Sequence, residues 1–271
     1  SVGRVSIGGY WRSSNLVHAI FGNLWRLIKL RYLVKLCKPD AVYSFLPQTN
    51  VLVLLATCGI SCPIIVSERN WPNQEVLDPL WRLGRQFTYK RAFVVTANSE
   101  EIRLGLEKIL HRKVVRVDNP IELPVWDSIS LRKDRVILVV GRLVNQKGLD
   151  FLIQVFSRSH QKFSDWQLII LGKGEEEGRL NQIIKENQLE NQVKLMGEVS
   201  DTHLWYDKAS LFMLTSHYEG TPNSALEAMA WGIPLLATDT CGGLADLLTH
   251  KVDGFIVDRT EDSVLEAMSW I

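Results

Sequence analysis

The chain has 271 residues, enough for two domains, and its apolar content of 46% and charged content of 23% are ordinary for a globular protein. The formal net charge is +1 and no dense Lys/Arg tract appears, which argues against a nucleic-acid-binding protein. No apolar run is long enough to cross a bilayer. The four cysteines (Cys37, Cys58, Cys62 and Cys241) form no zinc-binding pattern, so we expect reduced thiols, a cytoplasmic location and no structural metal.

Charge is unevenly divided along the chain. Residues 1–128 hold 17 Lys and Arg against 10 Asp and Glu, a net charge of +7, whereas residues 129–271 hold 14 against 20, a net charge of −6. Such asymmetry suggests two domains with different partners, and the basic half suits an anionic membrane or acceptor. The stretch 118–134 is polar and holds two prolines, so we predict an interdomain linker there.

The first predicted helix spans residues 16–37 and carries a mixed aromatic and basic strip. Trp25, Lys29, Tyr32 and Lys35 follow helical spacing and share one face. Aromatic rings mixed with lysines suit a membrane–water interface. The alternative is an ordinary solvated face.

Short apolar segments then alternate with helical patterns. In the first half we predict a helix capped by Ser99 and strands at 41–45, 64–66, 93–96 and 114–117. In the second half we predict strands at 136–140, 167–171, 193–196, 211–215, 234–238 and 254–257. This alternation predicts an α/β fold with two Rossmann-like domains, whose parallel sheets face one cleft and bind ligands beyond the carboxyl ends of the strands.

Two loops in the second half suit phosphate or close backbone approach. The segment 141–148 follows a strand and carries Gly141, Arg142 and Lys147, whose cations suit the oxygens of a diphosphate. The segment 172–174 (Gly-Lys-Gly) follows the next strand, and Gly197 ends another. These glycines lack the spacing of the dinucleotide fingerprint, which disfavours an oxidoreductase. Polar loops and plain turns are the alternatives.

The most informative segment is 216–230, which holds Glu219 and Glu227. Gly220 gives the turn after Glu219 backbone freedom, Thr221 is a candidate helix cap, and Pro222 suits a first helical position. Glu227 then falls within that helix. Free amides at the helix start favour an anion, and two carboxylates can hold hydroxyls, so the pattern suits a sugar joined to a diphosphate. The alternative is a capped helix with two surface glutamates.

These segments together resemble glycosyltransferase family 4, the retaining enzymes of the GT-B fold. The resemblance implies no catalytic metal or cofactor, and it implies that Glu219, Arg142 and Lys147 act in catalysis. It implies that the donor-binding residues are Gly141, Gly172, Lys173, Gly197, Gly220, Thr221, Pro222, Asn223 and Glu227, with Glu227 on the ribose.

The segment 66–72 resembles a first-domain motif in a subset of this family that builds cell-surface glycans, often on polyprenyl-diphosphate-linked acceptors. It places Glu68, Arg69 and Asn70 after a strand, where they are expected to face the cleft on the acceptor side. A polar turn with a salt bridge is the alternative. The same likeness favours a uridine nucleotide carrying a hexose or an N-acetylhexosamine.

The sequence therefore predicts a metal-independent retaining glycosyltransferase. Residues 1–128 would bind the acceptor and residues 129–271 the nucleotide sugar, in a cytoplasmic protein with peripheral membrane contact. The family normally begins with a further strand and glycine-rich loop and ends with further helices, so we expect both domains to be truncated and leave the chain's own activity open. A nucleotide-sugar epimerase of the same fold and a non-catalytic sugar-nucleotide-binding subunit remain as alternatives.

Overall fold

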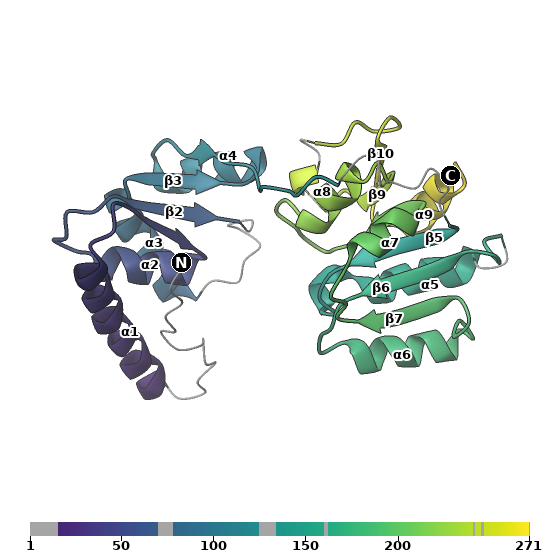
Figure 1. The fold of residues 1–271 in the computed structure, drawn as a ribbon, viewed down its shortest axis with the longest axis horizontal. Helices are drawn as coiled ribbons and strands as arrows, with labels where there is room; N and C mark the ends of the chain where they lie inside the picture. The colour runs from purple at the N-terminus through teal and green to yellow at the C-terminus, as the bar shows by residue number, and fades with distance from the viewer. Residues whose placement is uncertain are drawn as a thin grey trace. The chain divides into compact units, whose positions relative to one another are not determined.

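The computed structural model describes residues 16–69, 78–124, 134–159, 162–240, 242–244 and 247–270. The chain divides into two compact units, Ser1–Asp118 and Asn119–Ile271 (Figure 1). The predicted boundary between residues 128 and 129 lies outside the described residues, and the structure assigns residues 119–124 to the second unit.

The first unit is built on a parallel sheet with the strand order β1-β2-β3-β4. Its elements are α1 (Leu16–Cys37), β1 (Val42–Phe45), α2 (Pro47–Ala56), β2 (Ile64–Glu68), α3 (Pro79–Thr88), η1 (Tyr89–Arg91), β3 (Val94–Ala97), α4 (Glu100–Leu110) and β4 (Val115–Arg116). Every strand predicted in the first half is present, within two residues of its expected ends.

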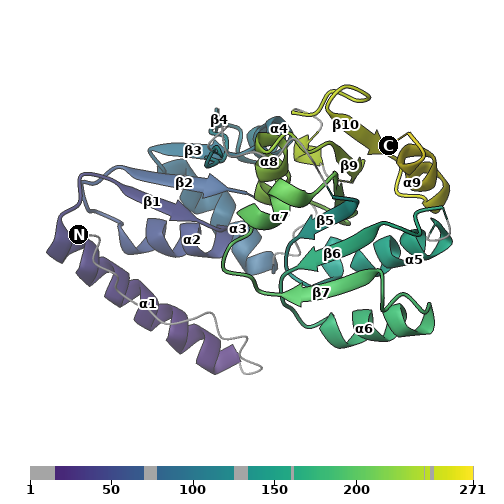
Figure 2. The same ribbon diagram turned by 45° about the vertical axis from the view of Figure 1, so that its right-hand side comes forward.

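Helices α2 and α4 cover the same face of this sheet, since both pack with Val66 and Val95 in one core cluster. Tyr43 and Phe45 on the other face of β1 are 45% and 40% exposed. Helix α1 lies beside α2 (Figures 1 and 2). Ser99 caps α4 as predicted, because its hydroxyl accepts a hydrogen bond from the Ile102 amide at 3.2 Å. The core of the unit packs Leu54, Val66 and Leu106 around Tyr89, all at most 1% exposed.

The second unit is a parallel sheet with the strand order β10-β9-β8-β5-β6-β7. Its elements are β5 (Val136–Val140), η3 (Asn145–Lys147), α5 (Leu149–Ser159), β6 (Gln167–Leu171), α6 (Glu177–Glu186), β7 (Val193–Gly197), α7 (His203–Lys208), β8 (Leu211–Leu214), α8 (Asn223–Ala230), β9 (Leu235–Thr238), η4 (Gly242–Leu244), β10 (Gly254–Val257) and α9 (Glu261–Met268). All six strands predicted in this half are present.

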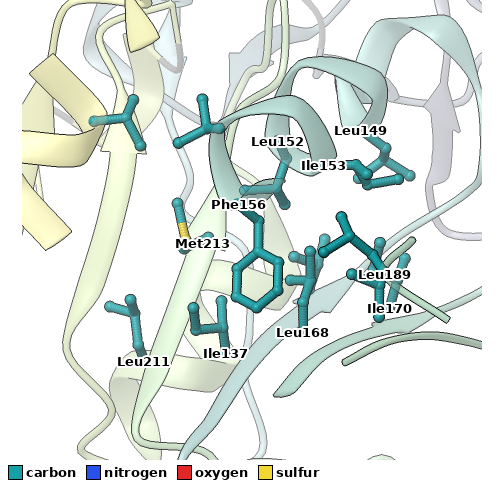
Figure 3. Close-up of a cluster of buried hydrophobic side chains, with 14 of the residues drawn as sticks. Ile137, Leu149, Leu152, Ile153, Phe156, Leu168, Ile170, Leu189, Leu211 and Met213 are labelled. Atoms are coloured by element: carbon teal, nitrogen blue, oxygen red, sulfur yellow. The ribbon is translucent and has the colours of Figure 1, made fainter. Parts of the chain in front are cut away.

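Alternate residues of the central strands point to opposite faces of this sheet. On one face Ile137 packs with Phe156 of α5, together with side chains of α6 and α9 (Figure 3). On the other face Leu138 packs with Tyr206 of α7 and Ala225 of α8. Continuous apolar strands are needed because both faces are covered, and the sheet is therefore doubly wound.

Helix α8 begins one residue later than predicted. Pro222 occupies the N-cap position with no side-chain cap hydrogen bond, so the expectation that Thr221 caps the helix is wrong. Proline fits here because its ring fixes φ near the observed −73° and the position needs no amide proton. The first turn of α8 consequently lacks a side-chain cap.

Candidate active site

The strand order of the second sheet switches direction at β5. The chain passes from β5 to β6 on one side, while β8 lies on the other side of β5. The loops that leave β5 and β8 lead to helices on opposite faces of the sheet, α5 and α8, and such a switch point is where open α/β sheets bind ligands. These are the loop 141–148 and the segment that begins at Thr215.

The two loops are locked together by backbone contacts. Gly148 has a φ of +59°, and a Cβ atom there would lie 2.4 Å from the Thr215 carbonyl oxygen. The Thr215 hydroxyl donates to the Gly148 carbonyl at 3.1 Å, and the His217 amide donates to the Gln146 carbonyl at 2.8 Å. Glycine at position 148 allows this close approach, which sets the positions of the neighbouring side chains.

Two of the predicted catalytic residues meet where these two loops touch. The Lys147 ammonium lies 2.5 Å from a carboxylate oxygen of Glu219, and the side chains are only 14% and 11% exposed. The Ser216 hydroxyl donates to the same Glu219 oxygen at 2.9 Å. A cation and an acid separated by 72 positions are thus held as a largely buried pair.

A second glycine contact shapes the turn between Glu219 and α8. A Cβ atom on Gly243 would lie 2.2 Å from the Gly220 carbonyl oxygen, so η4 packs directly on the backbone of this turn. Asn119 donates to the Thr221 carbonyl at 3.2 Å and to the Asn223 side-chain oxygen at 2.6 Å. The start of α8 is therefore held from two directions.

Glu227 projects from α8 and is held by a buried tyrosine. The Tyr206 hydroxyl donates to one Glu227 carboxylate oxygen at 2.7 Å and lies 3.3 Å from the Ser224 carbonyl oxygen. Tyr206 itself is fully buried. Burial, and then the hydrogen bond to Glu227, raise the pKa of Tyr206, so its hydroxyl remains protonated at neutral pH.

A pocket of about 450 Å³ opens at the carboxyl ends of β5 and β6. Its lining includes the predicted donor residues Gly141, Arg142, Gly172 and Lys173, together with Val140, Leu171, Glu198, Val199 and Thr202. Gly172 has a φ of +134°, and its amide donates to the Gly197 carbonyl at 2.7 Å. Gly197 thus supports the pocket through its backbone and does not line it.

The Lys147–Glu219 pair does not line this pocket but borders it. A Cβ atom on Gly141, which lines the pocket, would lie 3.1 Å from Cε of Lys147. Glu219 is joined through Gly220 and Thr221 to the start of α8. The predicted donor residues therefore form one connected set along the carboxyl edge of the sheet.

The residues predicted for the acceptor side lie in the first unit. Glu68 is fully buried at the end of β2, where it accepts a hydrogen bond from the Tyr89 hydroxyl, which is bonded in turn to Asn50 at 2.9 Å. Tertiary packing thus uses the Glu68 side chain as an internal hydrogen-bond acceptor of the first unit. Arg69 stacks over the Phe45 ring at 4.6 Å, and Asn70 lies outside the described residues.

Several contributors to the site were missed by the sequence reasoning. Arg259, which follows β10, donates to the Thr215 carbonyl at 3.2 Å and stacks over the Phe151 ring at 4.5 Å. Its guanidinium lies 3.4 Å from the His217 ring. Partial burial, and then this guanidinium, lower the pKa of His217. Nothing in the local sequence identifies Arg259, because its partners come from other elements.

No group of three or more His, Cys, Asp or Glu side chains suited to a metal ion occurs among the described residues. Within the same part of the chain, no helix is both long and apolar enough to span a bilayer. The exposed face of α1 carries Phe21, Trp25, Ile28 and Tyr32, each at least 53% exposed. Arg31 points away from this face, since it donates to the Ala56 and Cys58 carbonyls at 2.8 and 2.7 Å.

The fold is shared with solved structures of sugar-transfer proteins. Anabaena HepE in complex with UDP-glucose superposes with a TM-score of 0.79 at 21% identity, covering 92% of this chain and 73% of HepE. Two parallel sheets packed against helices, together with this likeness, define the GT-B class of fold. The chain belongs to the glycosyl transferases group 1 family, whose model matches residues 126–271.

Sequence relatives extend this result. An uncharacterized glycosyltransferase of Haemophilus influenzae is 32% identical over 166 residues, which cover 61% of this chain and 47% of the relative. An alpha-1,4-N-acetyl-D-galactosaminyltransferase of Campylobacter jejuni is 25% identical over 260 residues, which cover 94% of this chain and 71% of that enzyme. The name of that enzyme gives its acceptor as a GalNAc-containing saccharide on diNAcBac-PP-undecaprenol. The chain therefore spans about half the length of the first of these relatives.

Proposed function

We propose that this chain belongs to a retaining glycosyltransferase that moves a hexose or N-acetylhexosamine from a nucleotide diphosphate sugar, with UDP as the expected nucleotide. The proposed acceptor is a glycan or a polyprenyl-diphosphate-linked sugar in cell-surface polysaccharide or glycan synthesis. The observation that carries the proposal is the Lys147–Glu219 pair, which joins the loops that follow β5 and β8.

The proposed donor places its diphosphate on Lys147, Arg142 and the start of α8. The bound diphosphate takes over from Glu219 as the main partner of Lys147, and the released carboxylate accepts hydrogen bonds from the sugar. The free amides of α8 contribute further positive potential. As the bond to the sugar breaks, these groups stabilise the negative charge of the leaving diphosphate without a metal ion.

The remaining groups position the two ends of the nucleotide. The pocket lined by Gly172 and Lys173 is proposed to hold the base, and Glu227 is proposed to hold the ribose hydroxyls. Retention of configuration is inferred from the family resemblance. Arg69 and Asn70 stay proposed acceptor-side residues, and Glu68, which precedes them and is buried at the end of β2, stays proposed with them.

A thermal-shift screen of nucleotide sugars tests the donor site. A nucleotide sugar present at a hundred times its dissociation constant is expected to stabilise the chain by about 2.7 kcal/mol. Uridine nucleotide sugars are expected to give the largest rise in Tm. If no nucleotide sugar raises the Tm, the proposal is wrong.

Transfer of radiolabelled sugar by the complete enzyme separates this proposal from its alternatives. Label that moves to an acceptor supports a transferase. Label that stays on the nucleotide with changed configuration identifies an epimerase, and binding without turnover identifies a non-catalytic subunit.

We also propose peripheral contact between α1 and an anionic membrane on the cytoplasmic side. The exposed aromatic and aliphatic residues of α1 suit a lipid interface, Lys29 lies 4.6 Å from the Trp25 ring, and the helix contains no acidic residue. An anionic headgroup layer complements this combination of side chains.

Binding to anionic vesicles is expected to weaken with added salt, and to weaken about fivefold in Lys35→Gln, because one surface cation contributes about 1 kcal/mol. Lys185→Gln on α6 is the matched control and is expected to bind normally. Sedimentation with neutral and anionic vesicles measures both. Equal recovery with the two lipids contradicts the proposal.

A further inference from the structure

We propose that Tyr206 is a positioning residue that orients the Glu227 carboxylate for the nucleotide ribose, an inference that rests on the proposed nucleotide-sugar function. Tyr206 lies on α7 and Glu227 on α8, so the pair joins two helices on one face of the second sheet. Their contact is the 2.7 Å hydrogen bond from the phenol to one carboxylate oxygen.

The hydroxyl of Tyr206 is held in place by its surroundings. The side chain is fully buried, and its ring stacks against Phe212 with the ring centroids 6.2 Å apart. The hydroxyl also lies 3.3 Å from the Ser224 carbonyl oxygen in the first turn of α8. A buried phenol needs a hydrogen-bond partner, and in the part of the chain that the structure describes both of its acceptors lie on α8.

This arrangement assigns different tasks to the two oxygens of Glu227. One oxygen accepts from Tyr206. The side chain is only partly buried, so the other oxygen is left to accept from a ligand. Fixing a flexible glutamate before the ligand arrives removes part of the entropy loss of binding. A carboxylate held in this way can discriminate a ribose from a deoxyribose. When the ribose hydroxyl is missing, the carboxylate oxygen loses its hydrogen-bond donor, and binding is weaker.

The phenol of Tyr206 is also held in its donor form. Burial, and then Glu227, raise the pKa of Tyr206, so the hydroxyl stays protonated at neutral pH. A phenylalanine at position 206 would keep the ring packing and remove only the donor.

The test measures ribose discrimination by Tyr206→Phe. Among UDP, GDP and ADP, the diphosphate that the wild-type chain binds most tightly is titrated with its 2′-deoxy and 3′-deoxy forms. For each deoxy form, the dissociation constant is divided by that of the ribonucleotide, and the larger of the two ratios is compared between proteins. We expect this ratio to be about fivefold to tenfold smaller in Tyr206→Phe than in the wild type, which is the scale of losing one orienting hydrogen bond to a carboxylate. Affinity for inorganic pyrophosphate is expected to stay within about twofold, because the phosphate contacts are unchanged.

Three companion variants make the outcome decisive. Glu227→Gln is expected to lose the discrimination as well, and Glu227→Asp is expected to lose it because the shortened side chain withdraws from the phenol. Tyr43→Phe, which removes a hydroxyl 3.2 Å from that of Thr96 in the first unit, is expected to keep it.

The outcomes separate this inference from the function on which it rests. If Tyr206→Phe or Glu227→Asp keeps the wild-type ratio while Glu227→Gln loses it, Tyr206 is not a positioning residue. If the wild-type chain binds none of the three diphosphates, the proposed function itself is wrong. If Tyr206→Phe does not fold, Glu227→Asp decides the question, since its side chain lies at a partly exposed position.

Discussion

Lys147→Ala is expected to lower the turnover of the complete enzyme by at least about tenfold, which corresponds to ~1.4 kcal/mol of lost transition-state stabilisation. The variant removes a cation from the diphosphate site, and it also leaves Glu219 without its partner at a position where the side chain is only 11% exposed. An unpaired carboxylate there repels the donor phosphates, so both changes act in the same direction.

Two further variants separate the loss of the cation from the isolated acid. Lys147→Ala is expected to lower the free energy of unfolding by about 1–3 kcal/mol. The double variant Lys147→Ala/Glu219→Gln is expected to regain this stability but not the turnover. Lys185→Ala on α6 is the matched loss of an exposed cation and should leave the rate unchanged. Initial rates and urea unfolding measure the two effects. A complete enzyme whose turnover is indifferent to Lys147→Ala contradicts the assignment of this lysine.

Gly172→Ala is expected to destabilise the second unit by more than about 2 kcal/mol and to abolish nucleotide binding. The new Cβ atom would lie 1.9 Å from the Gly141 carbonyl oxygen, and φ at this position is +134°. The clash is with backbone, so relief requires moving the β5 loop that carries Arg142. Loss of affinity should therefore accompany loss of stability.

Gly178→Ala is the matched control for this substitution. Gly178 lies in α6, has no atom within 4 Å of the added Cβ position and has an ordinary φ. Alanine there is expected to stabilise the unit by about 0.5–1 kcal/mol. Thermal unfolding and nucleotide titration of both variants check the prediction. A Gly172→Ala protein with wild-type Tm and affinity would show that the close approach is not needed.

Much of the fold could be predicted from the alternation of apolar strands with amphipathic helices, since a parallel sheet covered on both faces needs that pattern. Helices α2 and α3 were not predicted. The run 51–58 within and after α2 is apolar with almost no polar interruption, so it shows no helical period, and a short apolar run of this kind does not distinguish helix from strand.

Site residues could be predicted where the functional side chains follow one another in a single loop. Contacts between side chains of different helices, strands and loops could not be predicted. Lys147 and Glu219 were identified from their separate loops, but their pairing depends on the β5–β8 contact and on Gly148. Tyr206, Arg259 and the lining residue Glu198 act through neighbours far along the chain.

The burial of Glu68 could not be predicted from the sequence either. Glutamates are usually exposed, and here the contact with the buried Tyr89 hydroxyl holds the side chain inside the first unit. The burial of an acid whose partner lies 21 positions away is a tertiary property that local spacing does not carry.

A crystal structure of this chain grown with UDP tests the central claim most directly. We predict phosphate oxygens within hydrogen-bonding distance of Lys147 and Arg142 near the start of α8, with Glu227 on the ribose and the base in the pocket beside Gly172. Nucleotide bound on any other surface, or a bound nucleotide that leaves Lys147 paired with Glu219 and untouched by phosphate, would contradict it.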